Sequence, residues 1–426
     1  MVGLGTVGGG VAELLRAHGD AYARRGGRPL TITRAVVRDV AKARATGLLP
    51  ENALSTDVDA VLGADVDVVV EVAGGVDFAR GVVERALRAG KHVVTANKAL
   101  LAAHGPALFA LAREHGVALT FEASCGGGMP CVTALRHGLL GSEVQSLRGI
   151  LNGTCNYILT QMTRHGQAYA DALADAKRLG YAEADETLDV SGADAAQKLC
   201  VLASIAFDTA VAEGDVRLGG IDTLHLADVG FGAQLGYDIR LVAGAERSRA
   251  GLALSCEPAF VPVGSELANV TGSLNALRVV GNAVGPVMIT GAGAGKGPTA
   301  AAVVSDLLNV AGGVAGAASD GMGVDPTARA SLPIVPADDQ RGRFYLRFGA
   351  ADEPGVIGRA TSLLGDAGIS LSAVLQPEVG EDHATDAVPV VVTTHGARRG
   401  DVAAVCAQLE ALDAVTGRVT VLRILD

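Results

Sequence analysis

The clearest capacity for chemistry lies in residues 180–198, where acidic side chains precede a single lysine. The carboxylates are Glu183, Asp185, Glu186, Asp189 and Asp194, and the lysine is Lys198. The sequence becomes helical from about residue 191, because an alanine-rich segment runs into LCVLASIA without a break. Asp194 and Lys198 are four residues apart and therefore share one face of this helix. A lysine held among carboxylates can act as a general acid or base, although the same spacing also fits an exposed ion pair at a helix start.

A glycine turn at the beginning of the sequence predicts a dinucleotide site. Gly3, Gly5 and Gly8 form a GxGxxG pattern, after which apolar residues recur at helical spacing. Such glycines let the backbone approach a pyrophosphate, which lies on the amide groups of the helix N-terminus. Only Met1 and Val2 precede the first glycine, whereas a Rossmann unit has a buried strand of about five residues there. We therefore expect a shortened first strand or a start site further upstream.

Residues 38–42 follow a predicted second strand at 30–37 and bear on the choice of cofactor. Arg38 and Lys42 favour the 2′-phosphate of NADP, whereas Asp39 would accept the ribose hydroxyls of NAD. A solvated turn without a cofactor contact is the remaining interpretation. The basic residues favour NADP(H), and NAD(H) stays open.

Two further strands bring polar residues to the sheet edge at which ligands bind. Residues 66–73 form a continuous apolar strand that ends at Gly74, as a buried parallel strand should. A strand at 91–96 then delivers Asn97 and Lys98 to its carboxyl end. Because ligands of open α/β sheets bind at that edge, we expect Lys98 beside the nicotinamide or the substrate. A lysine that opens a helix in solvent is the alternative.

A glycine-rich run follows a predicted strand at 117–123 and offers oxygen ligands or a hinge. Glu122 closes the strand, and the sequence SCGGGMP follows from residue 124. One carboxylate with several backbone carbonyls suits a hard cation, whereas the composition alone favours a hinge between domains. Cys125 in this run is either a covalent nucleophile or a small buried residue.

The pattern changes in the middle of the chain. Asn152, Gly153 and Thr154 begin a helix whose exposed amides and hydroxyl could bind a substrate carboxylate or form an ordinary N-cap. Strands of an antiparallel sheet are predicted at 239–245, 252–256 and 278–284. A second glycine-rich segment, residues 291–299, precedes a helix and is either a linker or a cover over the dinucleotide.

Composition narrows the class of protein. Hydrophobic residues make up 49% and aromatic residues only 3% of the chain, so small aliphatic side chains must pack helices against sheets in an α/β fold. The net charge of −11 without a basic cluster argues against a nucleic-acid partner, and no apolar run reaches membrane-spanning length. The six cysteines form no CxxC motif, which indicates neither a zinc site nor a disulfide framework and favours a reducing cytoplasm.

In combination these motifs resemble homoserine dehydrogenase. The resemblance is carried by GLGTVG at 3–8, Asn97-Lys98, segment 122–130, NGTCNY at 152–157, segment 180–198, and GAG at 293–295 with Pro298-Thr299. It spans residues 1 to about 312 with all motifs in order. The family interconverts L-homoserine and L-aspartate 4-semialdehyde with NAD(P)(H), within the synthesis of threonine, methionine and isoleucine.

The resemblance implies a role for each matching residue. Lys198 would be the acid/base lysine, with Lys98 between the nicotinamide and the substrate. Substrate-binding residues would be Glu183, Asp194, Asp189, Gly153, Thr154 and Tyr181. Together with the patterns above, it predicts cofactor contacts at Gly3, Gly5, Thr6, Val7, Gly8, Arg38, Lys42, Gly74, Asn97, Lys98, Gly180 and Gly295. The structural sodium ion (Na+) of the family maps to the Glu122 carboxylate and the carbonyls of Cys125, Gly127 and Met129, in place of the hinge.

Alcohol oxidation explains the need for a lysine. A base must take the hydroxyl proton while a hydride leaves for the nicotinamide, and reduction needs the same group as an acid. A lysine does this near neutral pH only if its pKa falls from about 10.4. Burial or the cation Lys98 would lower the pKa of Lys198, whereas Asp194 would raise it. We therefore expect the carboxylates to hold chiefly the ammonium group of the substrate.

The C-terminal part predicts a separate module. Residues 313–342 lack periodicity and form a predicted linker. Residues 343–426 follow the βαββαβ order of a ferredoxin-like fold and resemble an ACT domain, a small amino-acid-sensing module. The turn at Asp352 and Gly355 would then form an effector site, for which threonine is the hypothesis. A domain that only assists assembly is the alternative.

The predicted organisation is therefore an α/β chain of three domains and a linker. A Rossmann-type parallel-sheet domain at 1–130, completed by about 296–312, binds NAD(P). An α+β domain at 131–295 provides substrate binding and dimerisation, and the linker and the ACT domain follow. We expect a homodimer or tetramer acting on a small molecule.

Two other functions remain open from the sequence. A thiol-dependent semialdehyde dehydrogenase would use Cys125 as its nucleophile and need a histidine base, and His115 and His137 are the nearest in sequence. A non-enzymatic regulator would bind a nucleotide and sense an amino acid through the C-terminal module. An assay of NADPH oxidation with the semialdehyde separates these functions.

Overall fold

Two compact units make up the chain, and each combines stretches that are far apart in sequence. The computed structural model describes residues 1–63, 65–182, 185–314, 331–377 and 387–426. The first unit consists of Met1–Gly153, Asp194–Gly214 and Ser273–Leu332, and the second of Thr154–Ala193, Asp215–Gly272 and Pro333–Asp426. The boundaries predicted near residues 130, 295 and 342 rest on sequence patterns and stay predictions.

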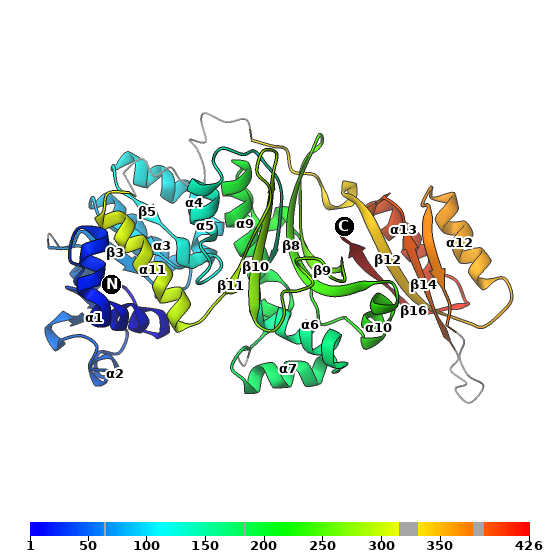
Figure 1. Ribbon diagram of the computed structural model, residues 1–426, viewed down its shortest axis with the longest axis horizontal. Helices are drawn as coiled ribbons and strands as arrows, with labels where there is room; N and C mark the ends of the chain where they lie inside the picture. The colour runs from blue at the N-terminus through cyan, green and yellow to red at the C-terminus, as the bar shows by residue number, and fades with distance from the viewer. Residues whose placement is uncertain (64, 183–184, 315–330, 378–386) are drawn as a thin grey trace. The chain divides into compact units, whose positions relative to one another are not determined.

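A parallel Rossmann-like sheet forms the base of the first unit (Figure 1). The pairs are β1 (Ala35–Val36) with β2 (Leu54–Ser55), and β3 (Val68–Glu71) with β4 (His92–Thr95) and then β5 (Leu119–Thr120). Val2 forms parallel bridges to both Val36 and Glu71. Two residues thus take the position of a strand between β1 and β3, in line with the expected short first strand. The second strand is also shorter than the predicted 30–37, because only its last part pairs.

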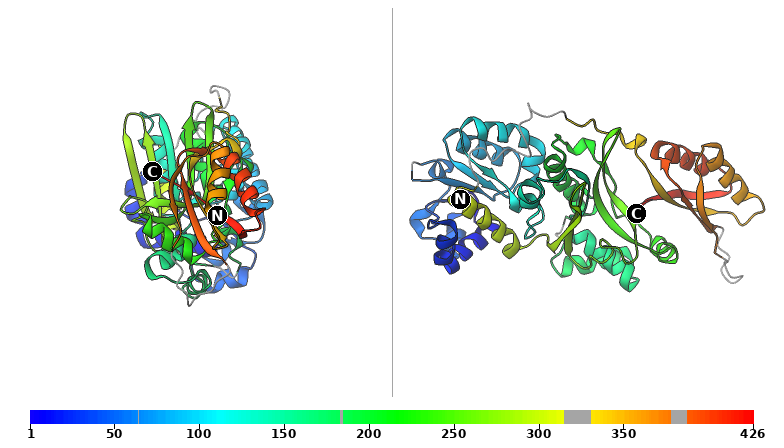
Figure 2. Two further views of the ribbon diagram at one scale, coloured as in Figure 1. Left: turned by 90° about the vertical axis from the view of Figure 1, so that its right-hand side faces the viewer. Right: turned by 45° about the horizontal axis from the view of Figure 1, so that its top comes forward.

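The first unit contains several helices besides this sheet, and the last of them comes from much later in the chain. They are α1 (Thr6–Gly26), α2 (Val40–Ala45), α3 (Asp77–Arg88), α4 (Lys98–Glu114), α5 (Cys131–Thr133) with a π-helical turn (Ala134–Gly138), α9 (Ala193–Phe207) and α11 (Lys296–Ala311). Figure 2 shows α11, in yellow-green, beside α1, in blue. A Cβ at Gly10 of α1 would lie 2.9 Å from the Ala300 side chain. Glycine therefore permits the close approach of the two helices.

An antiparallel sheet completes the first unit. Its strands are β6 (Val144–Ile150), β10 (Leu274–Gly281) and β11 (Gly285–Ala292), with β10 in the middle. The predicted strand at 278–284 is wrong in extent, since β10 begins at Leu274 and ends at Gly281. The next strand, β11, was not predicted. Gly285 has φ +71°, a backbone conformation that glycine adopts readily. It closes the tight turn of the β10–β11 hairpin.

The second unit contains a long antiparallel hairpin and several short helices. The strands are β7 (Arg217–Leu218), β8 (Tyr237–Ser248) and β9 (Gly251–Pro262), and the helices are α6 (Gly153–His165), α7 (Tyr169–Arg178), α8 (Thr187–Val190) and α10 (Leu226–Gln234). β8 and β9 pair along their whole length, from Tyr237 with Pro262 to Ser248 with Gly251. Both strands are longer than predicted, because the sheet buries polar as well as apolar residues.

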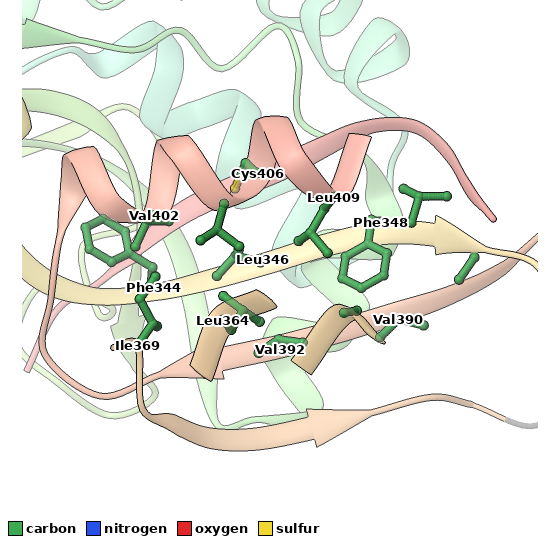
Figure 3. Packing of buried hydrophobic residues seen from close by; sticks show 14 of the residues in the cluster. Phe344, Leu346, Phe348, Leu364, Ile369, Val390, Val392, Val402, Cys406 and Leu409 are labelled. Carbon is green, nitrogen blue, oxygen red and sulfur yellow. The ribbon is translucent and has the colours of Figure 1, made fainter. Parts of the chain in front are cut away.

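The C-terminal part of this unit follows the predicted order of strands and helices. It comprises β12 (Arg341–Ala350), α12 (Val356–Asp366), β13 (Leu371–Leu375), β14 (Val388–Thr394), β15 (Ala397–Arg398), α13 (Arg399–Glu410) and β16 (Val415–Ile424). The principal strands lie in the order β16-β12-β14-β13. Figure 3 shows the core, in which Phe344, Leu346 and Phe348 of β12 pack against residues of both helices. Residues 315–330 of the predicted linker lie outside the described residues.

The C-terminal strands continue the sheet of the β8–β9 hairpin. β16 pairs with β9 in parallel, with Arg423 opposite Ala259 and Ile424 opposite Phe260. Asp228 of α10 is fully buried and accepts hydrogen bonds from Tyr345 Oη at 3.0 Å and Arg347 Nε at 2.6 Å. The last strands are thus joined to the hairpin by backbone pairing and by a buried charge pair.

Among the described residues, no helix combines the length and the apolar character needed to cross a membrane.

Candidate functional site

A carboxylate shared by two lysines lies in the first unit. Lys198 and Asp194 occupy one face of α9, and their Nζ and Oδ2 atoms are 2.7 Å apart. Lys98 reaches the other oxygen, Oδ1, at 3.1 Å. Lys198 also donates to the carbonyl oxygen of Leu151 at 2.7 Å. The i,i+4 pair predicted from the sequence is therefore present, and Lys98 joins it from the Rossmann sheet.

The start of α4 determines where Lys98 lies. Asn97 follows β4 directly, and its Oδ1 accepts a hydrogen bond from Leu100 N at 3.1 Å as the N-cap of α4. Its Nδ2 donates to the carbonyl oxygen of Gly75 at 2.6 Å. Lys98 is the first residue of the capped helix and therefore lies at the carboxyl end of β4, as predicted.

Asn152 is a member of this cluster that the sequence did not single out by itself. It was interpreted as part of a helix cap, together with Gly153 and Thr154. In the structure Asn152 is 5% exposed, and its Nδ2 donates to Asp194 Oδ2 at 2.9 Å. The turn between β6 and α6 thus contributes a neutral donor to the carboxylate. An asparagine before the helix-starting glycine was the available signal, and a contact with residue 194 cannot be inferred from spacing.

The electrostatics of the cluster favour an ionised Asp194. Burial would raise the pKa of this carboxyl, but the charges of Lys198 and Lys98 and the hydrogen bonds from Lys198 and Asn152 outweigh burial. The pKa of Asp194 therefore lies well below its usual value. The result is an anion fixed between two cations in a largely enclosed position.

The glycine turn has the geometry that an approaching dinucleotide needs. Gly3 has φ +98°, and a Cβ at Gly8 would overlap the Gly3 carbonyl oxygen. Gly5 precedes α1, whose first residues are Thr6 and Val7, so the backbone amides of the first turn are available to a phosphate.

The other predicted cofactor residues fall at turns and helix starts. Gly74 at the end of the strand has φ +77° and Gly295, which precedes α11, has φ +119°. Gly180 follows α7 in the second unit. Arg38 is exposed in the turn before α2, and Lys42 lies within that helix. Asp39 caps α2, since its Oδ1 accepts a hydrogen bond from Lys42 N at 2.9 Å.

Several predicted substrate residues belong to the second unit, where they contact each other. Thr154 Oγ1 donates to the carbonyl oxygen of Tyr181 at 2.6 Å. The carbonyl oxygen of Asp189 accepts a hydrogen bond from Cys155 Sγ at 3.1 Å. Gly153 begins α6, whereas Glu183 lies outside the described residues. The substrate roles of these residues stay predictions.

Glu122 is buried at the end of the parallel sheet, as the proposed cation site requires. Its carboxylate accepts hydrogen bonds from Val132 N at 2.9 Å and from Thr133 N and Oγ1 at 2.8 and 2.5 Å. Burial raises the pKa of Glu122, and the bonds from Thr133 and Val132 counteract part of that rise. A cation beside the carboxylate would offset the same cost of burial.

The neighbouring loop has the chemistry of a hard-cation site. Gly127 has φ +56° and packs against the backbone of Gly293, and the carbonyl oxygen of Met129 accepts Cys131 N at 2.8 Å. Carbonyl oxygens have two lone pairs each, so such a bond leaves capacity for an ion. Among the described residues, no group of three or more His, Cys, Asp or Glu could hold a metal.

The environment of Cys125 is unfavourable for a nucleophilic thiol. Burial raises the pKa of Cys125 to about 11, although the hydrogen bond from Ser124 and the charges of Lys198 and Lys98 lower it in part. The thiolate is the reactive form, and little of it exists near neutral pH. Cys125 therefore corresponds to the small buried residue of the two interpretations.

The phosphate-binding glycine turn, the parallel sheet and the lysine pair at the sheet edge define a nicotinamide-dependent oxidoreductase. Residues 3–122 match the family profile described as "Homoserine dehydrogenase, NAD binding domain". Residues 130–308 match the profile described as "Homoserine dehydrogenase". The chain belongs to the homoserine dehydrogenase family. It is an enzyme of amino-acid biosynthesis that interconverts L-homoserine and L-aspartate 4-semialdehyde.

Individual relatives match over the full chain. A homoserine dehydrogenase from Pseudomonas aeruginosa is 40% identical over 429 residues, covering 99% of this chain and 97% of the relative. The crystal structure of a homoserine dehydrogenase from Thiobacillus denitrificans has a TM-score of 0.93 at 41% identity, covering 100% and 97%. A hyperthermophilic archaeal homoserine dehydrogenase mutant in complex with NADPH has a TM-score of 0.61 at 25% identity, covering 72% and 95%. Neither the thiol-dependent dehydrogenase nor the non-enzymatic regulator finds support here.

Replacement of Asp194 by Asn should destabilise the protein at neutral pH, because two ammonium groups lose their shared counter-ion. Loss of one partner of a buried ion pair costs about 3–5 kcal/mol. We expect the lower end, since the Lys98 side chain is 31% exposed. The folded-state pKa of Asp194 lies below its unfolded value of about 3.9, so the stabilisation is complete well above that pH and is lost as the pH falls. The difference in unfolding free energy between wild type and variant should therefore shrink in acid.

Urea unfolding at pH 7 and at stepwise lower pH measures this difference. Asp175→Asn is a matched control, because Asp175 pairs with Arg178 at the surface and surface pairs contribute about 0–1 kcal/mol. A loss for Asp194→Asn that equals the control, or that stays constant into acid, would contradict the expectation.

Proposed function

We propose that Lys198 and Lys98 form the acid/base centre of the homoserine–semialdehyde interconversion. The observation that carries the proposal is the shared carboxylate: Asp194 contacts the ammonium groups of Lys198 at 2.7 Å and Lys98 at 3.1 Å. The Lys198 amine is also held by the carbonyl oxygen of Leu151 at 2.7 Å, and Lys98 is the first residue of the capped helix α4. This arrangement supports proton transfer at a defined atom.

Lys198 is the proposed proton carrier. In the oxidative direction Lys198 takes the proton from the hydroxyl oxygen of homoserine while the carbon that bears this hydroxyl loses a hydride. In the reductive direction Lys198 returns the proton to that oxygen. The nicotinamide, when bound, accepts or supplies the hydride. The Lys198 side chain is 11% exposed and that of Lys98 is 31% exposed. Lys198 is the more enclosed amine and therefore exchanges its proton less readily with bulk water. The proposed role of Lys98 is to orient the substrate oxygen.

Asp194 links substrate binding to this proton transfer. The substrate carries its own ammonium group, which Asp194 is proposed to bind together with Glu183, while Asp189 supports them. Once Asp194 is the counter-ion of the substrate ammonium, it stabilises the charged form of Lys198 less. This favours the neutral Lys198 amine, the form that can act as a base. Gly153, Thr154 and Tyr181 are further proposed substrate-binding residues.

Lys198→Ala and Lys98→Ala should each lower kcat by about 10²–10⁴-fold, the usual contribution of a positioned acid or base. The double variant should lose little more than the worse single variant, because residues that act as a unit are not additive. Initial rates with the semialdehyde and NADPH provide the measurement. Lys91→Ala is the control, since Lys91 precedes β4 at its amino end. Wild-type turnover in the double variant would refute the acid/base assignment.

NADP(H) is the proposed preferred cofactor. Asp39, the residue that would favour NAD, is engaged in capping α2 through its bond to Lys42 N. Arg38 is exposed beside it and can meet a 2′-phosphate. The NADPH complex of the archaeal relative agrees with this preference. NAD(H) remains a usable cofactor, because the ribose hydroxyls can still bind in the same turn.

Arg38→Ala should raise the KM for NADPH by about 10–100-fold, the equivalent of one hydrogen bond to a charged group at about 1.5–3 kcal/mol. The KM for NADH should change little, because NADH lacks the 2′-phosphate. Arg44→Ala, within the adjacent helix α2, is the control, since Arg44 pairs with Glu51. An unchanged ratio of the two KM values would remove Arg38 from the cofactor site.

A structural sodium ion is proposed at Glu122 and the carbonyls of Cys125, Gly127 and Met129. The buried carboxylate and the tight loop against Gly293 support it. The melting temperature should be higher in sodium chloride than in tetramethylammonium chloride at equal ionic strength, because a bound ion stabilises the folded state. Equal melting temperatures in the two salts would count against the site.

The C-terminal module is the proposed ACT regulatory domain. Gly355, with φ +90°, forms the turn before α12, and Asp352 lies in that turn beside β12. Threonine is the proposed effector, and unchanged initial rates across millimolar threonine would reject it. Assembly into a dimer or tetramer is also proposed, and a monomeric mass in sedimentation equilibrium would reject that.

A further inference from the structure

Glu71 is a buried acid that the acid/base assignment above does not use. It is the last residue of β3, at the carboxyl end of the parallel sheet, and its exposure is 0%. An uncompensated carboxylate in such a position would be strongly unfavourable. No separate sequence signal points to it, because Glu71 lies inside the apolar run at 66–73. Its burial calls for a role that depends on its hydrogen bonds.

The side chain of Glu71 holds the loop that follows β3. Its Oε1 accepts hydrogen bonds from Ala73 N at 3.0 Å and Gly74 N at 3.1 Å. Gly74 and Gly75 both have φ +77°, a conformation that glycine adopts readily, so the bonds from Glu71 select one of the conformations open to this loop. One carboxylate oxygen therefore fixes the loop in which a cofactor contact is predicted.

The second oxygen of Glu71 reaches the neighbouring strand. Glu71 is paired in register with Thr95 of β4, and Thr95 Oγ1 donates to Glu71 Oε2 at 2.7 Å. The same hydroxyl oxygen accepts a hydrogen bond from Asn97 N at 3.1 Å. Thr95 has 0% exposure. The Thr95 hydroxyl thus links the Glu71 carboxylate at the end of β3 to Asn97, the residue that caps α4.

Asn97 closes this chain of contacts. Its Nδ2 donates to Gly75 O at 2.6 Å, back in the loop after β3, and its Oδ1 caps α4 through Leu100 N at 3.1 Å. Lys98 is the first residue of α4. A closed set of hydrogen bonds therefore runs from the glycine loop through Glu71, Thr95 and Asn97 to Leu100 N in the first turn of α4, the turn that Lys98 begins.

We infer that Glu71, acting through Thr95, is a positioning residue that aligns Lys98 with the glycine loop at residues 74–75. The inference rests on the proposed role of Lys98. Loss of the Thr95 hydroxyl removes both the acceptor of Asn97 N and the link to Glu71 Oε2, and so loosens the start of α4. A misplacement of about 1 Å at a reacting group can cost about 10²-fold in rate. Glu71 would thus affect turnover without touching the substrate.

Thr95→Val tests the inference because valine keeps the shape and removes the hydroxyl. We expect kcat to fall by about 10–100-fold, and Thr95→Ser, which retains the hydroxyl, to recover most of the wild-type value. The decisive comparison adds Thr95→Val to Lys98→Ala. If Thr95 acts through Lys98, the second change lowers kcat by less than about twofold in that background.

The same loss of kcat in both backgrounds would show a merely structural role and overturn the inference. Wild-type kcat in Lys98→Ala would overturn the proposed role of Lys98, and with it the inference. A low kcat in Lys98→Ala, with the same further loss from Thr95→Val in both backgrounds, would overturn the inference alone and leave the role of Lys98 standing.

Glu71→Gln provides a second variant in case Thr95→Val fails to fold. Its Oε1 can still accept the amides of Ala73 and Gly74, but its Nε2 can only donate towards Thr95 Oγ1. The loop should therefore remain in place while the bond to Thr95 reverses. We expect a lower kcat with a less than twofold change in the NADPH dissociation constant, measured by fluorescence titration. A weakening of NADPH binding as large as the fall in kcat would contradict the route through Thr95.

Discussion

The carboxylate of Asp194 is the interaction on which the candidate site depends. Two ammonium groups cannot lie close together in an enclosed place unless an anion separates them, since their repulsion is stronger there than in water. Lys98 and Lys198 each take one oxygen of Asp194, and Asn152 adds a neutral donor. The sequence positions of these residues are far apart, so α4, α9 and the turn after β6 must all be held in place within the first unit.

The parallel sheet helps to hold these segments in place, because buried polar residues lie at the ends of its strands. Glu71 ends β3, Thr95 ends β4 and Glu122 follows β5. Each is buried, and each binds backbone amides of the segment that follows or of a neighbouring segment. Burial of these polar side chains without hydrogen bonds would be unfavourable. Backbone amides of the irregular segments at this edge of the sheet supply the hydrogen bonds that they need. The close packing of α11 on α1 completes the unit around them.

Local patterns predicted the elements better than their contacts. The i,i+4 relation of Asp194 and Lys198 and the location of Lys98 at a strand end followed from helix and sheet geometry, and both are found. The contact between Lys98 and Asp194 is tertiary and was not predicted, because spacing carries no such information; the family resemblance implied only that each residue lies beside the substrate. Glu71 was concealed in an apolar run, and Asn152 in a helix cap. β11 was missed because the turn at Gly285 divides one apolar stretch into two paired strands.

The pairing of β16 with β9 joins the C-terminal module to the rest of its unit through Ala259 and Phe260. Excision of the module would uncover the backbone donors and acceptors of these two residues and remove Arg347, the countercharge of Asp228. An open strand edge of this kind invites pairing with other chains and aggregation. A truncated form of this enzyme would therefore need another cover for that edge and another partner for Asp228.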